Sequence, residues 1–326
     1  MSVSYKAVGW NPFKIRYDLF LGIGVLLYLI LFSAVTLILH PANQPIQVLI
    51  RAFGSAAIIL LHIILAIGPL ARLHTGFLPL LYNRRHLGVT LFVLGFLHAA
   101  LSILWYHGFA DINPFLSVFT SDAGWSVAEF PFQAFGFLAL LILFVMAATS
   151  HDFWLANLTA PVWKTLHMGV YLAYGMLILH IAFGILQSET HSIYVILLGS
   201  SLFFLCSLHL IAAFREASHD RELSASPNEE DGFVRVCSVS DVPQDEAIGQ
   251  VIGGEKIAIV RWENQISVVS GVCQHQNGPL AEGKFLHGCL TCPWHGYQYK
   301  LDSGTSPEPF TEKIPTFRVR VQNGDV

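Results

Sequence analysis

Long runs of apolar residues that are almost free of charged side chains fill the first two thirds of the chain. Six runs are long enough, at about 1.5 Å per helical residue, to cross most or all of a bilayer core about 30 Å thick. The fourth is the shortest. The pattern predicts an all-α membrane domain, a bundle of six transmembrane helices over residues 17–39, 52–70, 87–105, 132–148, 166–186 and 192–214.

The pattern changes after residue 214. Residues 215–231 are polar, carry many charges and include Pro227, so we expect a linker with little capacity to pack. Beyond it, short β-rich runs such as KIAIVRW and ISVVSGV alternate with turns that contain Gly, Pro and Asp, which predicts a small all-β domain. The expected organisation is an N-terminal segment (1–16), a membrane domain (17–214), a linker (215–231) and a β domain (232–326).

Basic residues lie mainly on one side of the predicted spans. Only Arg51 flanks the other side, and the basic side carries Lys6, Lys14, Arg16, Arg72, Arg84, Arg85, Lys164, Arg215 and Arg221. The positive-inside rule then predicts that both termini and the β domain are cytoplasmic. We expect an integral, multi-pass protein in contact with membrane lipid, of the kind found in a bacterial inner membrane. A net charge of −4 argues against nucleic acid as a partner.

Two motifs in the β domain each carry one cysteine and one histidine. Cys273-Gln-His275 is followed, after sixteen intervening residues, by Cys292-Pro-Trp-His295. Two thiolates on one iron and two imidazoles on the other are the ligands of a Rieske [2Fe-2S] cluster. Tetrahedral zinc also binds such residues. The arrangement of one Cys and one His on each of two loops favours the cluster.

Residues 232–326 resemble the Rieske family, with Gly278-Pro279 after the first motif and Gly296 directly after the second. Respiratory-complex members carry a disulfide between the two cluster loops. The corresponding positions here are Gly278 and Trp294, which cannot form one.

The resemblance also bears on the redox potential. Those members place a serine and a tyrosine near cluster sulfurs, and the matching positions are Tyr297 and Tyr299. Hydrogen bonds to the sulfurs raise the potential. With at least one donor position altered, the resemblance implies a potential near the low end of the Rieske range, about −150 mV.

Four histidines lie at matched depths in the third and fifth spans, which run in the same direction. His86 and His98 are 12 residues apart, and His167 and His180 are 13 residues apart, offsets of about 18 and 20 Å along a helix. An imidazole in lipid is costly without a partner and marks a functional site by default. Two stacked haems would require this arrangement, and without a CxxCH motif they would be b-type. The alternative is that the imidazoles hydrogen-bond between helices.

Position distinguishes His86 and His62 from the other candidate haem ligands. Twelve residues at about 100° each leave His86 about 120° around an ideal helix from His98. His62 in the second span lies about as deep as His98, so it is a reserve ligand or a hydrogen-bond partner for a haem or a quinone.

The membrane half resembles the ferric reductase-like transmembrane family over roughly residues 15–215. The segments RRHLG and LHAALSILWY of the third span, and SHDFW and WKTLHMGVYLAYGMLILH around the fifth, carry the resemblance. It implies that His98, His167 and His180 ligate b haems that pass electrons across the membrane. Sulfoxide-reductase members lack a histidine at the position of His86, so one or two haems are expected.

The two resemblances together predict a membrane oxidoreductase. Electrons would pass from a cytosolic donor, a ferredoxin or reductase, through the cluster and haems to an acceptor outside or in the membrane, for instance a quinone. This route requires no catalytic acid, base or nucleophile. We find no Gly-rich dinucleotide fingerprint after a strand, which argues against direct use of NAD(P)H.

Two other function classes fit parts of the sequence. One is a non-catalytic electron-transfer subunit that supplies a separate reductase, such as a methionine sulfoxide reductase. The other is a Rieske oxygenase component, which needs an iron site of two histidines and a carboxylate. The helical half offers no obvious soluble pocket for such a site.

Overall fold

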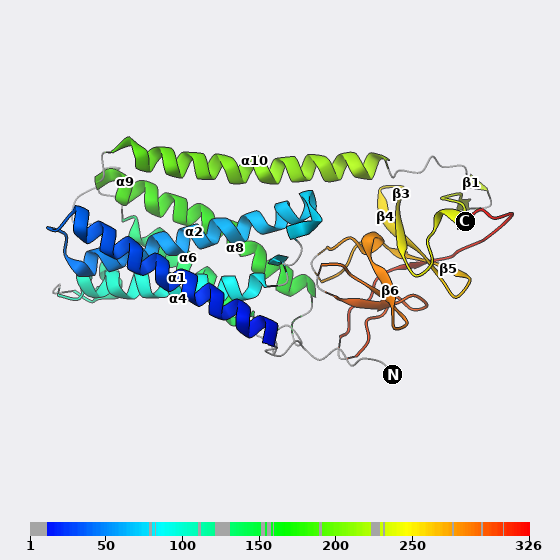
Figure 1. Ribbon diagram of the computed structural model, residues 1–326, viewed down its shortest axis with the longest axis horizontal. Coiled ribbons are helices and arrows are strands. Elements are labelled where there is room, and N and C mark those ends of the chain that lie inside the picture. The colour runs from blue at the N-terminus through cyan, green and yellow to red at the C-terminus, as the bar shows by residue number, and fades with distance from the viewer. Residues whose placement is uncertain are drawn as a thin grey trace.

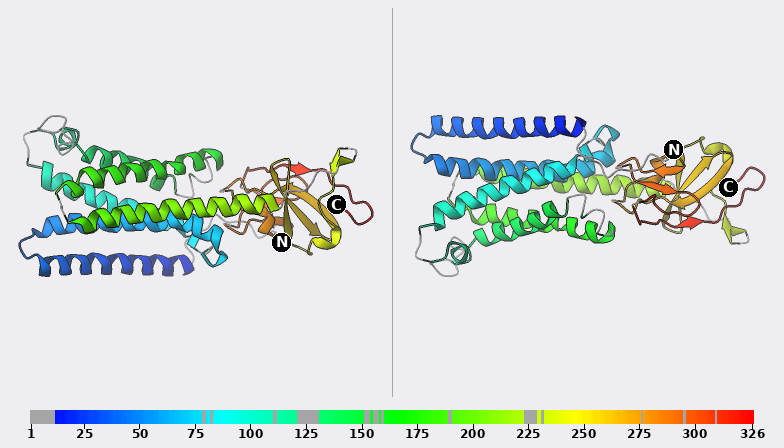
Figure 2. Two further views of the ribbon diagram at one scale, coloured as in Figure 1. Left: turned by 90° about the horizontal axis from the view of Figure 1, so that it is seen from above. Right: turned by 90° about the horizontal axis from the view of Figure 1, so that it is seen from below.

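The protein is described here by a computed structural model that covers residues 12–77, 80–81, 83–109, 112–120, 131–150, 154, 158, 160–188, 191–222, 229–230, 232–275, 277–294, 296–308 and 310–326. Figures 1 and 2 show an elongated molecule in which a helical bundle carries a small β domain at one end, near the C-terminal end of α10.

The bundle contains the predicted apolar helices. Its long helices are α1 (Pro12–Leu39), α2 (Pro45–Leu73), α4 (Arg84–Ser102), α6 (Gln133–Ala148), α8 (Ala160–Phe183) and α10 (Ser192–Glu222). The π-helix η2 (Ile103–His107) continues α4, and the short elements are η1 (Thr75–Phe77), α5 (Pro114–Ser117) and α9 (Ile185–Ser188). Within the described residues, five helices are long and apolar enough to cross a membrane. The exception is α6, the fourth predicted span, whose 16 residues extend about 24 Å, less than a bilayer core of about 30 Å.

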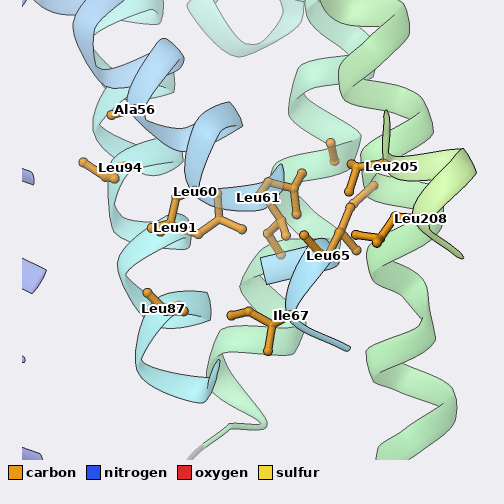
Figure 3. Packing of buried hydrophobic residues seen from close by; sticks show 14 of the residues in the cluster. Ala56, Leu60, Leu61, Leu65, Ile67, Leu87, Leu91, Leu94, Leu205 and Leu208 are labelled. Carbon is orange, nitrogen blue, oxygen red and sulfur yellow. The ribbon is translucent and has the colours of Figure 1, made fainter. Parts of the chain in front are cut away.

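Helix α2 supplies much of the buried centre of the bundle. Leu60, Leu61 and Leu65 of α2 belong to one apolar cluster with Leu91 of α4 and Leu208 of α10, as Figure 3 shows. Leu61 and Leu65 are four residues apart and lie on one side of the helix, whereas Leu60 lies about 100° around the helix from Leu61, so α2 packs against two neighbours at once. This packing fixes the relative positions of the helices that carry the histidines.

Apolar side chains also cover the outside of the bundle. Phe20 of α1 is 73% exposed, and Phe203 and Phe214 of α10 are 74% and 70% exposed. Water would not tolerate so continuous an apolar surface, whereas lipid does. The helical half is therefore a membrane domain.

The β domain is built from short antiparallel strands. One sheet has the order β3 (Ala247–Ile252), β4 (Glu255–Trp262), β5 (Gln265–Ser270) and β9 (Thr316–Phe317). A second sheet contains β6 (Lys284–Leu286), β7 (Cys289–Thr291) and β8 (Gln298–Lys300), and β1 (Glu229–Glu230) pairs with β2 (Phe233–Val234). The 3₁₀ turns η4 (Val239–Asp241) and η5 (Leu280–Glu282) lie between strands.

Two-residue turns close the hairpins of these sheets. Gly253 and Gly254 join β3 to β4, and Glu263 and Asn264 join β4 to β5, all four with positive φ. Such turns match the twist of the strands that they connect. The sheets thereby form a rigid support for the two loops that carry the cysteine and histidine motifs.

Helix α10 continues into the segment that we predicted to be a linker. Residues 215–222 are helical, whereas the sequence analysis assigned all of 215–231 to a flexible connection. The Arg, Glu and Ala residues in this stretch favour helix. Glu216 also forms ion pairs with Arg72 of α2, at 3.2 Å, and Lys256 of β4, at 2.9 Å. The high charge that indicated a linker therefore serves to connect the two domains.

Candidate functional site

The two motif loops of the β domain have the same backbone hydrogen-bond pattern. In the first, Cys273 N–H donates to the carbonyl of Gly278 at 2.9 Å, and Asn277 N–H donates to the carbonyl of Cys273 at 2.8 Å. In the second, Cys292 N–H donates to the carbonyl of Tyr297 at 2.7 Å, and Gly296 N–H donates to the carbonyl of Cys292 at 3.0 Å. The fourth residue after each cysteine has positive φ. Two equivalent loops thus carry the two cysteines that the sequence motifs paired, and the first loop also carries His275.

Both loop cysteines are buried, Cys273 at 1% and Cys292 at 2% exposure. The loops lie so close that a Cβ on Gly278 would be 2.6 Å from Cys292 Sγ. Glycine is therefore required where the first loop passes the second. This arrangement suits a compact group bound between them, as an iron-sulfur cluster is.

Tyr299 lies beneath the first loop. Its hydroxyl is 3.4 Å from Cys273 Sγ and accepts a hydrogen bond from Gln274 N–H at 3.0 Å. Burial is the main cause that raises the pKa of this phenol, and the neighbouring Cys273 raises it further, so the hydroxyl keeps its proton. A retained proton can be donated to sulfur, as the sequence analysis expected at this position.

His275 projects from the first loop toward the bundle. Burial lowers the pKa of His275 to about 4, and the positive charges of Arg85 and Arg84 act in the same direction. A neutral imidazole is the form that binds a metal. The fourth predicted cluster ligand, His295, lies outside the described residues.

The structure brings His98 and His180 together. These residues come from α4 and α8, and their ring centroids are 6.2 Å apart with the ring planes at 87°. A metal–imidazole bond of about 2 Å on each side of one iron, plus about 1 Å from each nitrogen to its ring centre, gives roughly 6 Å between centroids. The spacing of the two rings fits a single iron ligated by both.

Neighbouring helices orient both imidazoles in the same way. His98 Nδ1 lies 2.8 Å from the carbonyl of Ile50 in α2, and His180 Nδ1 lies 3.0 Å from the carbonyl of Phe132, just before α6. A carbonyl only accepts hydrogen bonds, so each Nδ1 carries the proton. Each Nε2 therefore keeps the lone pair that a haem iron requires.

Glycines make room for these rings. A Cβ on Gly54 would lie 2.8 Å from His98 Nδ1, and a Cβ on Gly136 would lie 2.8 Å from His180 Nδ1. Each glycine stands four residues after the residue whose carbonyl binds the ring. The repeated combination of a carbonyl and a glycine four residues later gives His98 and His180 equivalent surroundings.

The two histidines predicted near the basic end have different neighbours. His167 Nδ1 lies 2.9 Å from the carbonyl of Trp163, and its Nε2 lies 3.4 Å from Ser150 Oγ. His86 Nδ1 lies 2.6 Å from Asp18 Oδ1 of α1. In the part of the chain that the structure describes, His86 makes no ring contact with His167. The reserve candidate His62 contacts the hydroxyl of Tyr174, 3.2 Å from its Nε2.

Trp163 connects the two domains. Its indole stacks on His167 at a centroid distance of 3.8 Å and on His275 of the β domain at 5.8 Å. From the second motif loop, Trp294 packs against the apolar cluster of the bundle, and the Arg72 guanidinium lies 5.8 Å from its ring centroid. Both motif loops thus touch the membrane domain, at the end that carries His167.

Sequence analysis missed Trp163, Gly54 and Gly136. Trp163 stands four residues before His167, which places both on one face of α8, and this spacing was the only available signal. Gly54 and Gly136 contact histidines on other helices, so no local pattern marks them.

Residues 53–178 match the family described as ferric reductase like transmembrane component, and residues 232–318 match the Rieske [2Fe-2S] domain. The heme-binding subunit MsrQ of the protein-methionine-sulfoxide reductase of Bordetella pertussis is 34% identical over 137 residues, 42% of this chain and 61% of that protein. The ferredoxin component of the alkene monooxygenase system of Xanthobacter autotrophicus is 29% identical over 95 residues, 29% of this chain and 78% of that protein.

A solved complex of the oxygenase and ferredoxin of carbazole 1,9a-dioxygenase contains a chain that is 26% identical, with a TM-score of 0.27, over 28% of this chain and 96% of that one. The family matches show that this chain joins a ferric reductase-like transmembrane domain to a C-terminal Rieske domain. That combination supports a redox or electron-transfer role at a membrane.

Proposed function

We propose that this chain is a membrane oxidoreductase that passes electrons from a cytosolic donor through a Rieske [2Fe-2S] cluster to one or two b-type haems, and on to an acceptor in the membrane or outside it. The observation that carries the proposal is the stack of His275, Trp163 and His167, which joins a predicted cluster ligand to a predicted haem ligand across the domain boundary. When bound, cluster and haem each take up and release single electrons.

The proposed ligands are the residues that the sequence motifs predict. Cys273, His275, Cys292 and His295 would hold the cluster, with the thiolates on one iron and the imidazoles on the other. His98 and His180 would hold the first haem, since their Nδ1 hydrogen bonds fix the tautomer that exposes Nε2.

A second haem would use His167, with His86 as its predicted partner. Asp18 binds His86 Nδ1 and would orient that ring as a carboxylate orients many metal-bound imidazoles. His86 shares α4 with His98, and His167 shares α8 with His180. The second haem would therefore lie about 18 to 20 Å along the helices from His98 and His180, which we call the outer pair.

The β domain would face the cytoplasm. Arg72 and Arg215 lie where α2 and α10 approach it, and Arg85 and Arg84 act electrostatically on His275. A concentration of arginine at one end of a bundle is typical of the cytoplasmic side. Lipid would surround the exposed apolar helices.

Replacement of a cluster ligand tests this route. In the His275→Ala variant, reduction of the haem by the physiological donor should fall below detection, because electrons would have no entry through the cluster. His287→Asn is the matched control, since His287 is exposed in the turn between β6 and β7. Stopped-flow spectra of the haem bands report both rates. Unchanged haem reduction in His275→Ala would remove the cluster from the route.

The cluster potential gives a separate test. The hydroxyl of Tyr299 lies near Cys273 Sγ. Tyr297 stands where respiratory-complex members have a serine donor, and its ring stacks on His275 at a centroid distance of 5.0 Å. With fewer hydrogen bonds to sulfur, the midpoint should be about −150 mV. Redox titration monitored by EPR measures it, and a midpoint well above zero would contradict the expectation.

A second candidate is a non-catalytic subunit that supplies electrons to a separate reductase. The identity of 34% to a protein named as a heme-binding subunit of a methionine sulfoxide reductase favours it. The two candidates differ in what the purified chain does alone. Reduction of ferric chelates or oxygen by the chain alone would support the oxidoreductase, whereas activity only after addition of a partner reductase would support the subunit.

A further inference from the structure

Four aromatic rings form a continuous stack across the boundary between the two domains. Tyr297 stacks on His275 with centroids 5.0 Å apart and planes at 9°; His275 stacks on Trp163 at 5.8 Å and 22°; Trp163 stacks on His167 at 3.8 Å and 24°. The first two rings belong to the motif loops, and the last two belong to α8. Three successive contacts with nearly parallel planes thus link the β domain to the membrane domain.

Trp163 occupies the middle of this stack and is held there firmly. Its side chain is only 4% exposed, and its Nε1–H donates to the carbonyl of Thr149 at 3.1 Å. The buried indole therefore satisfies its single donor and has one defined orientation. The carbonyl of Trp163 also accepts from His167 Nδ1 at 2.9 Å. One residue thus orients His167 through its backbone and His275 through its ring.

Contacts on the other side of the interface keep the loops in place. Trp294 packs on the bundle beside Arg72. Lys256 of β4 pairs with Glu216 and Asp220 of α10, each at 2.9 Å. The stacking of His275 on Trp163 is therefore one of several contacts that hold the β domain in this position on the bundle.

We propose that Trp163 is the positioning residue for electron passage between the two domains: its indole holds the His275 loop at the His167 end of the bundle and fills the space between the two imidazoles. This inference rests on the proposed function and assigns it a residue. In the step concerned, one electron leaves the reduced cluster and reduces one ferric haem, or the reverse; no bond forms or breaks and no proton moves.

The size and shape of the side chain matter for this role. The large indole ring of Trp163 contacts both the imidazole of α8 and the imidazole of the first motif loop. A leucine at this position would leave a gap beside His275 and His167, and electron passage slows steeply across gaps. A phenylalanine would restore one aromatic ring but lose the hydrogen bond to Thr149. The expected order of transfer rates is therefore tryptophan, then phenylalanine, then leucine.

The experiment compares Trp163→Leu and Trp163→Phe with the full-length protein that contains its cofactors. Flash photoreduction followed by absorbance gives the rate of electron equilibration between cluster and haem. Trp154→Leu is the matched control, since Trp154 is a tryptophan nine residues before Trp163, ahead of α8, but is 42% exposed. Hydrogen–deuterium exchange of residues 273–278 and 292–297 reports docking of the loops independently of electron transfer.

The leucine variant should equilibrate at least about tenfold more slowly than wild type, the phenylalanine variant should fall between them, and the Trp154 control should match wild type. Hydrogen–deuterium exchange in the motif loops should be lowest in wild type, higher in the phenylalanine variant and highest in the leucine variant. A wild-type rate in Trp163→Leu, or no advantage of phenylalanine over leucine, would overturn the inference. If wild-type cluster and haem exchange no electrons although loop protection still depends on Trp163, the proposed function fails, while Trp163 still docks the His275 loop on the bundle.

Discussion

The two ends of the membrane domain use the same residue type in different surroundings. Toward the end away from the β domain, His98 and His180 face each other, and each is oriented by a carbonyl on a neighbouring helix beside a glycine. Toward the β domain, His167 stacks on Trp163, and His86 contacts Asp18. Depth in the membrane therefore does not distinguish these histidines. They differ in the group that contacts the Nδ1 atom and in the ring that covers the imidazole.

Loss of an outer histidine should produce the largest effect. His180→Leu removes one of the two proposed iron ligands and should abolish binding of the haem proposed to lie between His180 and His98, because the iron would then have an imidazole on one side only. Haem content per chain and the Soret absorbance measure this. His62→Leu serves as the control, since His62 contacts Tyr174 and not the outer pair. Full haem content in His180→Leu would exclude the outer pair as the haem site.

The glycine beside His98 allows a sharper test of the same site. In Gly54→Ala, the new Cβ would lie 2.8 Å from His98 Nδ1, so the ring must move and haem affinity should fall. The substitution by itself favours a helix by about 1 kcal/mol, so any loss comes from the contact. Gly88→Ala on α4 is the matched control, because nothing lies within 4 Å of its added Cβ. Equal haem retention in both variants would contradict the tight fit.

The ion pairs between domains should have the smallest effect. Lys256 is 35% exposed, and Glu216 and Asp220 are 42% and 31% exposed, so each pair should contribute no more than about 1 kcal/mol. Lys256→Gln should therefore raise exchange in the motif loops only modestly, and added salt should act on wild type in the same direction. Lys300→Gln, in the exposed end of β8, is the control. Complete undocking in Lys256→Gln would show that these pairs, and not the stack, hold the domains together.

The same pairs predict a pH dependence. Burial disfavours the charged ammonium of Lys256, but hydrogen bonds to Glu216 and Asp220 outweigh it and raise the pKa above its ordinary value of 10.5. A group with a raised pKa contributes its full stabilisation below its unfolded-state pKa and loses it as the pH rises through the folded-state pKa. Docking of the β domain on the bundle should thus weaken only above about pH 10.5. Hydrogen–deuterium exchange in the motif loops, corrected for the intrinsic pH dependence of amide exchange, measures it. A pH-independent interface in wild type, identical to that of Lys256→Gln, would contradict this.

Much of the fold followed from the sequence, because its determinants are local. Apolar runs of helical length predicted the bundle, and the paired Cys-x-His and Cys-x-x-His motifs predicted the Rieske domain that the family match identifies. The sequence did not reveal that residues 215–222 continue α10, since their charges have partners on distant segments. Nor did it reveal the pairing of Trp163 with His275, which depends on how two separate domains dock.

An absorbance and EPR spectrum of the purified protein, made with ample haem and iron, would show whether one chain binds both cofactors. We expect b-type haem bands with two imidazole ligands together with the g-tensor of a reduced Rieske cluster in the same preparation. Because the planes of His98 and His180 lie at 87°, the ferric haem should give the strongly anisotropic low-spin signal of perpendicular axial imidazoles. A protein without Soret absorbance would contradict the account and leave only a membrane-anchored iron-sulfur domain.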